Sequence, residues 1–136
     1  MDKKLAFALS GGGSRGALQV GALYALLEFG LQPDLLLGVS VGAANASFLA
    51  LNGFSRDSVD RLAKIWREAI SSELLPPNYV WLTVRAMFGR SSNDPSRHLK
   101  DFFITNGITP ELCFTEIKQP QLILVSSDLN TAKPVL

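Results

Sequence analysis

Leu35–Ala46 reads LLLGVSVGAANA, an apolar run that meets the pattern Gly-x-Ser-x-Gly and continues into an alanine-rich segment. The apolar run has the length of a buried strand, and the alanines favour a helix. A strand, a sharp turn and a helix therefore share one residue, Ser40. This layout is typical of a nucleophile elbow, in which a serine is held exposed at the start of a helix.

The residue types around Ser40 suit nucleophilic chemistry. Gly38 and Gly42 leave room for the neighbouring strand and helix at so tight a turn. The backbone N–H of Val41 and the positive end of the helix dipole can face the charge that develops on an attacked carbonyl oxygen. The same residues also suit a simpler interpretation, in which the serine only caps a helix between two glycines. Both interpretations stay open at this point.

Another strand and loop precede this stretch. Leu5–Leu9 is continuously apolar, as in a strand covered on both faces, and it leads into a glycine-rich loop at 10–16. Apolar residues then recur at helical spacing over 17–27, and Pro33 helps to turn the chain back into the next strand. The right-handed crossover rule makes the two strands parallel. The predicted fold class is α/β, with helices on a mostly parallel sheet.

The rest of the chain predicts further helices and strands. A helix from about Ala43 ends at Gly53, and Ser55 caps the next helix. The apolar stripe at 59–70 is expected to join the core, with a grip on lipid as the alternative. The aromatic stretch at 79–89 is either a lid for a lipid substrate or a buried helix. The remaining expected elements are a short helix at 99–106, a helix beginning at Pro110, a buried strand at 121–129, a turn at Asn130–Thr131 and a strand opening at Pro134.

The loop Gly11-Gly12-Gly13-Ser14-Arg15-Gly16 fits two kinds of site. It contains Gly-x-Gly-x-x-Gly between a strand and a helix, the context of a dinucleotide-binding fingerprint. That site needs an acid at the end of the second strand, where Ser40 stands, and Asp34 belongs to the opposite edge of the sheet. Alternatively, the N–H groups of Gly12–Gly13 stabilise an oxyanion formed by attack of Ser40. Arg15 is expected to hold the loop by bonding to carbonyls or to an acid, with a simply solvated side chain as the alternative.

Composition excludes several classes of protein. The 136 residues carry a net charge of +1, which gives no electrostatic basis for binding nucleic acid. The single cysteine, Cys113, lies in an apolar pattern and is expected to be a small core residue. The sequence shows no cluster of metal ligands, so no metal or cofactor is expected. It shows no membrane-spanning run and no convincing signal peptide, so we expect a cytoplasmic protein with peripheral membrane contact at most.

Taken together, the glycine loop at 11–16 and the elbow at 38–42 resemble the N-terminal part of a patatin-like phospholipase domain. Val125–Thr131 also resembles the family's next core strand and turn, so the resemblance covers essentially all of residues 1–136 as one domain portion. It implies a three-layer α/β fold with helices on both faces, and a Ser-Asp dyad that hydrolyses acyl lipids through an acyl-enzyme. It implies Ser40 as the nucleophile, an oxyanion loop of Gly11, Gly12, Gly13, Arg15 and Gly16, and an elbow of Gly38, Val41 and Gly42.

The sequence departs from the family at the catalytic base. The family's aspartate belongs to an Asp-Gly-Gly or Asp-Gly-Ala motif, and neither motif occurs in these residues. The other candidates are Asp128, which matches the family's non-catalytic turn, and His98, which lies in a polar stretch. The chain is therefore expected to be a truncated domain that is inactive in isolation. A lipid-binding remnant without turnover and a dinucleotide-binding domain are the alternatives.

Overall fold

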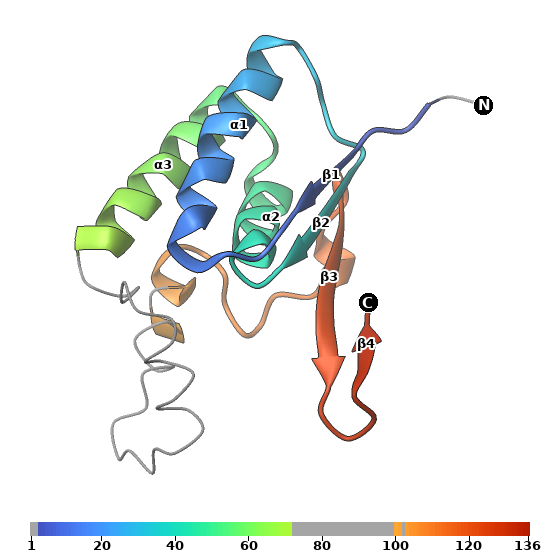
Figure 1. Cartoon of the computed structure of the whole chain (residues 1–136). Coiled ribbons are helices and arrows are strands. Elements are labelled where there is room, and N and C mark those ends of the chain that lie inside the picture. The colour runs from blue at the N-terminus through green and yellow to red at the C-terminus, as the bar shows by residue number, and fades with distance from the viewer. Residues whose placement is uncertain (1–2, 72–99, 102) are drawn as a thin grey trace.

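The computed structural model describes residues 3–71, 100–101 and 103–136. Strands and helices alternate in the first half of the chain, and a β-hairpin follows near its end (Figure 1). The elements in chain order are β1 (Ala6–Leu9), the 3-10 helix η1 (Gly13–Arg15), α1 (Gly16–Glu28), β2 (Leu35–Val39), α2 (Val41–Asn52), α3 (Arg56–Ser71), the 3-10 helix η2 (Phe114–Glu116), β3 (Gln121–Asp128) and β4 (Lys133–Val135).

The sheet is mostly parallel, which confirms the predicted α/β class. β1, β2 and β3 run parallel in that order, and β4 pairs antiparallel with β3. In this register Leu9 lies beside Gly38, and Val39 lies beside Val125. The glycine loop and the start of α2 therefore follow the carboxyl ends of two neighbouring strands, at the lower end of the sheet in Figure 1.

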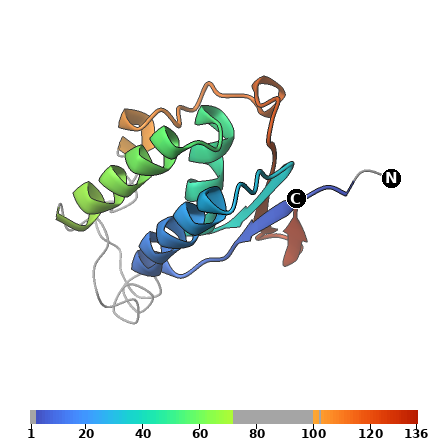
Figure 2. The same cartoon turned by 90° about the horizontal axis from the view of Figure 1, so that it is seen from above.

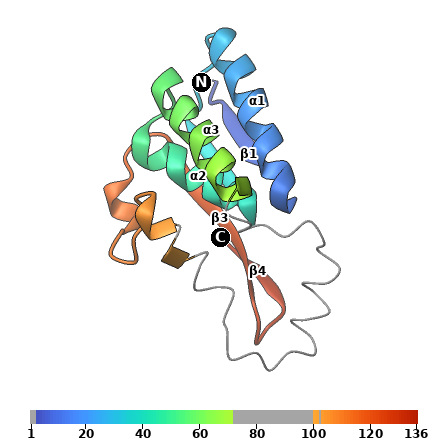
Figure 3. The same ribbon diagram turned by 90° about the vertical axis from the view of Figure 1, so that its left-hand side faces the viewer.

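The helices α1, α2 and α3 cover the same face of the sheet (Figures 2 and 3). The strand order β1-β2-β3 explains this arrangement, because two successive right-handed crossovers in one direction place both connections on one side. Phe7 and Leu36 are buried beneath this helical layer, whereas Ala6 and Ala8 are exposed. The second helical layer that the family resemblance implies is not among the described residues.

The core lies between this sheet face and the three helices. Leu23, Leu36 and Leu49 are fully buried, one each from α1, β2 and α2. From α3, Val59 and Trp66 join them, which confirms that the apolar stripe of this helix belongs to the core. Each large apolar side chain buried in this way stabilises the fold by about 1.5–3 kcal/mol.

β3, the turn after it and β4 form where the sequence predicts them, but β3 is less buried than predicted. The turn after Asp128 and the strand β4 lie where Asn130–Thr131 and Pro134 predict them. The residues of β3 are only partly buried or exposed, however, so the expectation of a buried strand is wrong. The described helices cover one face of the sheet, and the end of β3 continues into an exposed hairpin.

The helix predicted from Pro110 is also wrong. The segment forms turns and the single 3-10 turn η2, in which the Glu116 carboxylate accepts a hydrogen bond from the Cys113 N–H at 2.8 Å. Residues 110–116 are all exposed, so the segment lacks the packed apolar face that stabilises most helices in proteins. Cys113 is exposed, which corrects its assignment to the core.

The remaining expectations concern residues 79–106 and the membrane. Residues 100, 101 and 103–105 are helical, in agreement with a short helix at 99–106. The aromatic stretch at 79–89 and His98 lie outside the described residues. Within the described ranges, no helix has both the length and the apolar character needed to cross a membrane.

Candidate active site

Ser40 joins β2 to α2 in a strained backbone conformation. Its φ is 55° and its ψ is −127°, a region that residues other than glycine enter at a cost of about 1–3 kcal/mol. Its carbonyl accepts hydrogen bonds from the N–H groups of Ala43 at 2.9 Å and Ala44 at 3.3 Å, so the helix begins directly after the turn. Ser40 therefore stands at the N-terminus of α2, the positive end of the helix dipole.

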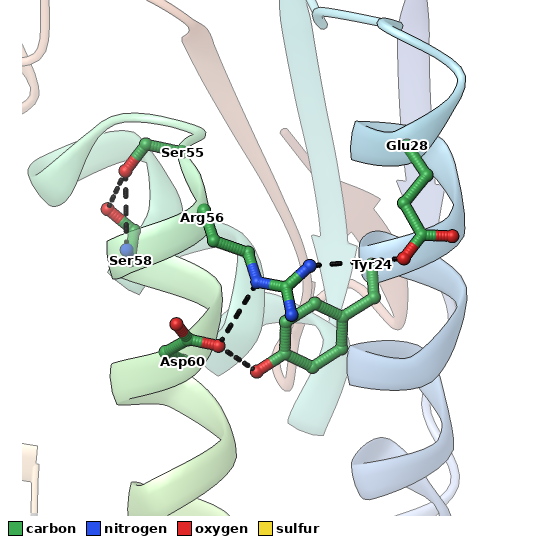
Figure 4. Close-up of polar contacts among 6 residues, drawn as sticks. All are labelled: Tyr24, Glu28, Ser55, Arg56, Ser58 and Asp60. Atoms are coloured by element: carbon green, nitrogen blue, oxygen red, sulfur yellow. Dashed lines mark hydrogen bonds and ion pairs between the residues drawn. The ribbon is translucent and has the colours of Figure 1, made fainter.

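The hydroxyl of Ser40 does not cap the helix. Ser40 occupies the N-cap position, but its side chain makes no capping hydrogen bond and the residue is exposed. Ser55 shows the ordinary behaviour of such a serine in the same chain, as the sequence predicts. Its Oγ accepts a hydrogen bond from the Ser58 N–H at 3.2 Å and lies 3.0 Å from the Ser58 Oγ (Figure 4). The interpretation of Ser40 as a structural cap is therefore wrong.

Gly38 and Gly42 sit where any side chain would collide with backbone. A Cβ at Gly38 would lie 2.5 Å from the Ala43 Cα. A Cβ at Gly42 would lie 2.7 Å from the Ser10 carbonyl oxygen and closer still to that of Leu9. The two glycines thus allow α2 to start against both its own strand and the end of β1.

The glycine loop lies in contact with Ser40. A Cβ at Gly11 would lie 3.1 Å from the Ser40 Cβ and 3.7 Å from its Oγ, so the loop backbone borders the hydroxyl directly. Gly13 has a φ of 57°, which glycine adopts without strain. Within the described part of the chain, the N–H groups of Gly12 and Gly13 make no backbone hydrogen bond. The structure therefore brings the Ser40 hydroxyl and the backbone of the glycine loop to one place.

An open groove of about 420 Å³ runs beside the glycine loop. Its apolar side includes Leu18, which is 73% exposed, and Ala22. Its polar end is formed by the loop itself, with Arg15 at the margin. The groove places apolar surface next to the loop.

Arg15 does not bind the loop as predicted. Its side chain is exposed and lies beside Gly12, and among the described residues it has no hydrogen-bond or ion-pair partner. Only its backbone N–H contributes, by donating to the Gly12 carbonyl at 3.2 Å. Arg15 ends the 3-10 helix η1 with its side chain exposed, so water can solvate the guanidinium.

A buried amide, Asn45, connects the two loops, and sequence reasoning missed it. Asn45 is 1% exposed and lies on α2, one helical turn after the start of the helix. Its Nδ2 donates to the Gly16 carbonyl at 3.1 Å and to the Gln19 Oε1 at 2.8 Å, and its Oδ1 accepts from the Trp66 Nε1 at 2.8 Å. The only signal in the sequence is an asparagine amid the alanines of an otherwise apolar helix.

The acid needed by a dinucleotide site lies at the wrong end of the sheet. Asp34 accepts a hydrogen bond from the Leu5 N–H at 2.7 Å, and its carbonyl accepts one from the Gln121 N–H at 2.9 Å. These contacts place Asp34 at the amino ends of the strands, whereas the glycine loop follows their carboxyl ends. This arrangement speaks against the dinucleotide interpretation.

Asp128 is engaged in the hairpin turn. Its carboxylate accepts hydrogen bonds from the Asn130 N–H at 2.8 Å and from the Thr131 hydroxyl at 3.0 Å. These bonds lower the pKa of Asp128 below its ordinary value of 3.8. A carboxylate with a lowered pKa and both oxygens occupied is a poor general base, so its geometry suits a turn-forming residue.

The fold and the two loops define a class of protein, an α/β protein with a serine elbow beside a glycine-rich loop. A family profile described as Patatin-like phospholipase matches residues 7–128. The chain therefore belongs to the patatin-like phospholipase family, whose members act on lipid substrates.

Three relatives illustrate the similarity. "Patatin-like phospholipase domain-containing protein 7" of Mus musculus is 41% identical over 69 residues, which cover 50% of this chain and 5% of the relative. "Patatin-like phospholipase domain-containing protein 6" of Homo sapiens is 33% identical over 94 residues, which cover 69% of this chain and 7% of the relative. "Lysophospholipase nte1" of Aspergillus terreus is 33% identical over 75 residues, which cover 50% and 5%.

These matches cover only a small part of each relative. The chain covers 7% or less of the length of each of the three proteins. No solved structure matches the chain.

Proposed function

We propose that this chain carries the nucleophile and the oxyanion hole of a serine acyl hydrolase that cleaves ester bonds of acyl lipids. The observation that carries the proposal is the state of Ser40 at the N-terminus of α2. Its backbone is strained, its side chain is exposed and makes no capping hydrogen bond, and it lies against the glycine loop. Membership of the family supports a lipid ester as the substrate.

The position of Ser40 beside the glycine loop supports the following reaction. The Ser40 Oγ attacks the ester carbonyl carbon while its proton passes to a general base. The negative charge on the carbonyl oxygen is stabilised by the N–H groups of Val41, Gly12 and Gly13 together with the α2 dipole. The alcohol leaves with the proton that the base took from Ser40, and water, deprotonated by the same base, then hydrolyses the acyl-enzyme to release the acid and free Ser40. A single oxyanion donor of this kind is worth roughly 3–4 kcal/mol of transition-state stabilisation.

We propose that the base is an aspartate outside these 136 residues. The Asp-Gly-Gly or Asp-Gly-Ala motif of the family does not occur in the sequence, and Asp128 is held in its turn. Because acyl lipids reside in bilayers and micelles, the proposed enzyme meets its substrate by peripheral contact with such a surface.

The proposal is tested by labelling with a fluorophosphonate probe and by hydrolysis of a p-nitrophenyl acyl ester. Both are measured on the complete gene product, on its Ser40→Ala variant and on Ser55→Ala, which removes a serine at the start of the next helix. We expect Ser40→Ala to abolish labelling and hydrolysis and Ser55→Ala to retain both.

The 136-residue chain, tested alongside, locates the base. Labelling of the complete product alone supports a base outside these residues, and Ser40-dependent labelling of the short chain contradicts that part of the proposal. Hydrolysis that survives Ser40→Ala overturns the proposed nucleophile.

A further inference from the structure

The two ends of the glycine loop are tied to the same buried side chain. Gly16, the last residue of the loop, accepts a hydrogen bond from the Asn45 Nδ2 through its carbonyl at 3.1 Å. At the other end, the carbonyl of Ser10, the residue directly before the loop, accepts a hydrogen bond from the Gln19 Nε2 at 2.6 Å. The Gln19 Oε1 in turn accepts a hydrogen bond from the Asn45 Nδ2 at 2.8 Å. Asn45 therefore reaches one end directly and the other through Gln19.

The chemistry of the partners fixes the orientation of the Asn45 amide. The indole N–H of Trp66 can only donate, so it must face the Oδ1, at 2.8 Å. The Gly16 carbonyl can only accept, so it must face the Nδ2. The two donors and the acceptor of this 1% exposed amide are thus all paired. A fully satisfied buried network of this kind favours one arrangement of the groups that it joins.

Steric contact supports the same arrangement. A Cβ at Gly16 would lie 2.5 Å from the Trp66 Cζ2 and 3.0 Å from the Val41 Cγ2. The end of the glycine loop is therefore packed against α3 and against the residue that follows Ser40. The loop, the nucleophile helix and α3 meet at this point, with Asn45 between them.

We infer that Asn45 is the positioning residue of the oxyanion hole: by holding both ends of the glycine loop, it sets the loop N–H groups relative to Ser40. The inference rests on the proposed function, because it assigns the loop amides to the developing oxyanion. Asn45 touches no reacting atom and acts through Gly16 and Gln19. Without it, the donors shift relative to the serine, and a misplacement of about 1 Å costs about 100-fold in rate.

The test compares matched substitutions on the same helix in the complete gene product. Asn45→Asp keeps the shape and the acceptor for Trp66 but loses the donors to Gly16 and Gln19. Asn52→Asp is the control, because Asn52 donates to the Phe48 carbonyl at 2.8 Å and accepts from Arg61 at 3.0 Å at the far end of α2. Gln19→Met is the second variant; it keeps the length of a half-buried side chain but removes both hydrogen bonds of Gln19, to the Ser10 carbonyl and from the Asn45 Nδ2. Asn45 keeps its bonds to Gly16 and Trp66 in this variant.

Two readouts are measured, kinetics on a p-nitrophenyl acyl ester and hydrogen exchange of the amides at 11–16. We expect Asn45→Asp to lower kcat by about 100-fold with KM unchanged, and to accelerate exchange in the loop. Gln19→Met is expected to do the same to a smaller extent, and Asn52→Asp to leave kcat and loop exchange as in the unsubstituted protein.

The outcomes separate this inference from the proposed function. If the unsubstituted protein is active and Ser40-dependent but Gln19→Met and a folded Asn45→Asp retain full kcat, the positioning role is overturned and the function stands. If the unsubstituted protein is inactive, the function fails, and with it the assignment of the loop as an oxyanion hole. A fall in kcat with faster loop exchange in Gln19→Met supports the inference even where Asn45→Asp does not fold.

Discussion

At the residue scale, Ser40 and Ser55 show how backbone conformation separates two serines in equivalent positions. Both precede a helix, yet Ser55 uses its hydroxyl to satisfy the Ser58 N–H and Ser40 leaves the start of α2 uncapped. An N-cap bond is worth typically about 1 kcal/mol, and the φ of 55° at Ser40 adds strain of its own. The start of α2 is therefore less stable than a capped, unstrained helix start would be, and it leaves the Ser40 hydroxyl exposed.

The strain at Ser40 leads to a prediction on stability. Ser40→Gly removes the Cβ that makes a φ of 55° unfavourable, so we expect the free energy of unfolding to rise by about 1 kcal/mol. Thermal or urea denaturation measures the change. Ser40→Ala is the control, because it also removes the hydroxyl but keeps the Cβ, and its stability should remain near that of the unsubstituted chain. A Ser40→Gly variant no more stable than Ser40→Ala would show that the turn is not strained.

Local spacing makes part of the candidate site readable from sequence. Gly38, Ser40 and Gly42 act within one turn, so their spacing alone predicts the turn that the structure shows. Asn45 is different, because its partners Gly16 and Trp66 lie 29 and 21 residues away in sequence. Only the packing of α1, α2 and α3 brings these residues together, and no short-range pattern encodes that packing.

At the element scale, α1 and α3 are also joined by a surface cluster (Figure 4). The Tyr24 hydroxyl donates to the Asp60 carboxylate at 2.6 Å, and the Arg56 guanidinium lies 4.7 Å from the centre of the Tyr24 ring. The hydrogen bond to Asp60 raises the pKa of Tyr24 above its ordinary value of 10.0. Arg56, Glu28 and Asp60 are exposed, so solvent screens the attraction between them. The buried Asn45 amide bonds to residues of both α1 and α3, and its hydrogen bonds are screened less.

The predicted elements succeed where capping and apolar spacing agree. α3 follows the Ser55 cap and buries its apolar stripe, and α2 begins at Val41, close to the predicted Ala43. The failure at Pro110 has the opposite cause. There the structure has turns in place of a helix, because residues 110–116 are exposed and have no apolar face packed against the fold.

The hairpin β3–β4 leads to a prediction on pH. Hydrogen bonds from the Asn130 N–H and, to a smaller extent, from the Thr131 hydroxyl stabilise ionised Asp128. They lower its pKa below 3.8. A lowered folded-state pKa contributes stability above the unfolded pKa, and this contribution disappears as the pH falls through the folded-state value. The Asn130 amide signal, followed by NMR, should therefore titrate with a midpoint below 3.8.

The matching variant is Asp128→Asn, which removes the titrating carboxyl. It should abolish the acid transition at the Asn130 amide while leaving the signals of β1 unchanged. A midpoint at or above the ordinary aspartate value in the unsubstituted chain would contradict the hydrogen-bonded turn.

At the scale of the whole molecule, buried structure is unevenly distributed along the chain. The described core cluster runs from Phe7 to Trp66, whereas β3 is only partly buried and all of β4 is exposed. Regions with few buried apolar contacts open locally at lower free energy than the core. The two parts of the fold should therefore differ in local stability.

Native-state hydrogen exchange measures this difference. We expect the amides of β2 and α2 to be the most protected, and those of β4 and of η2 to exchange first. Protection of β4 equal to that of β2 would contradict the uneven core. A ligand that binds only at the glycine loop should slow exchange there without changing β4.

The confinement of the Asn45 network to residues 10–66 has a consequence for biosynthesis. The described residues of this network all precede the hairpin in the chain, so they leave the ribosome before the hairpin is made. Helix-rich segments with contacts at modest sequence separation fold quickly, so the nascent chain can assemble the Ser40 turn against its loop while translation continues. The exposed hydroxyl is then in place before β3 has been synthesised to pair with β2.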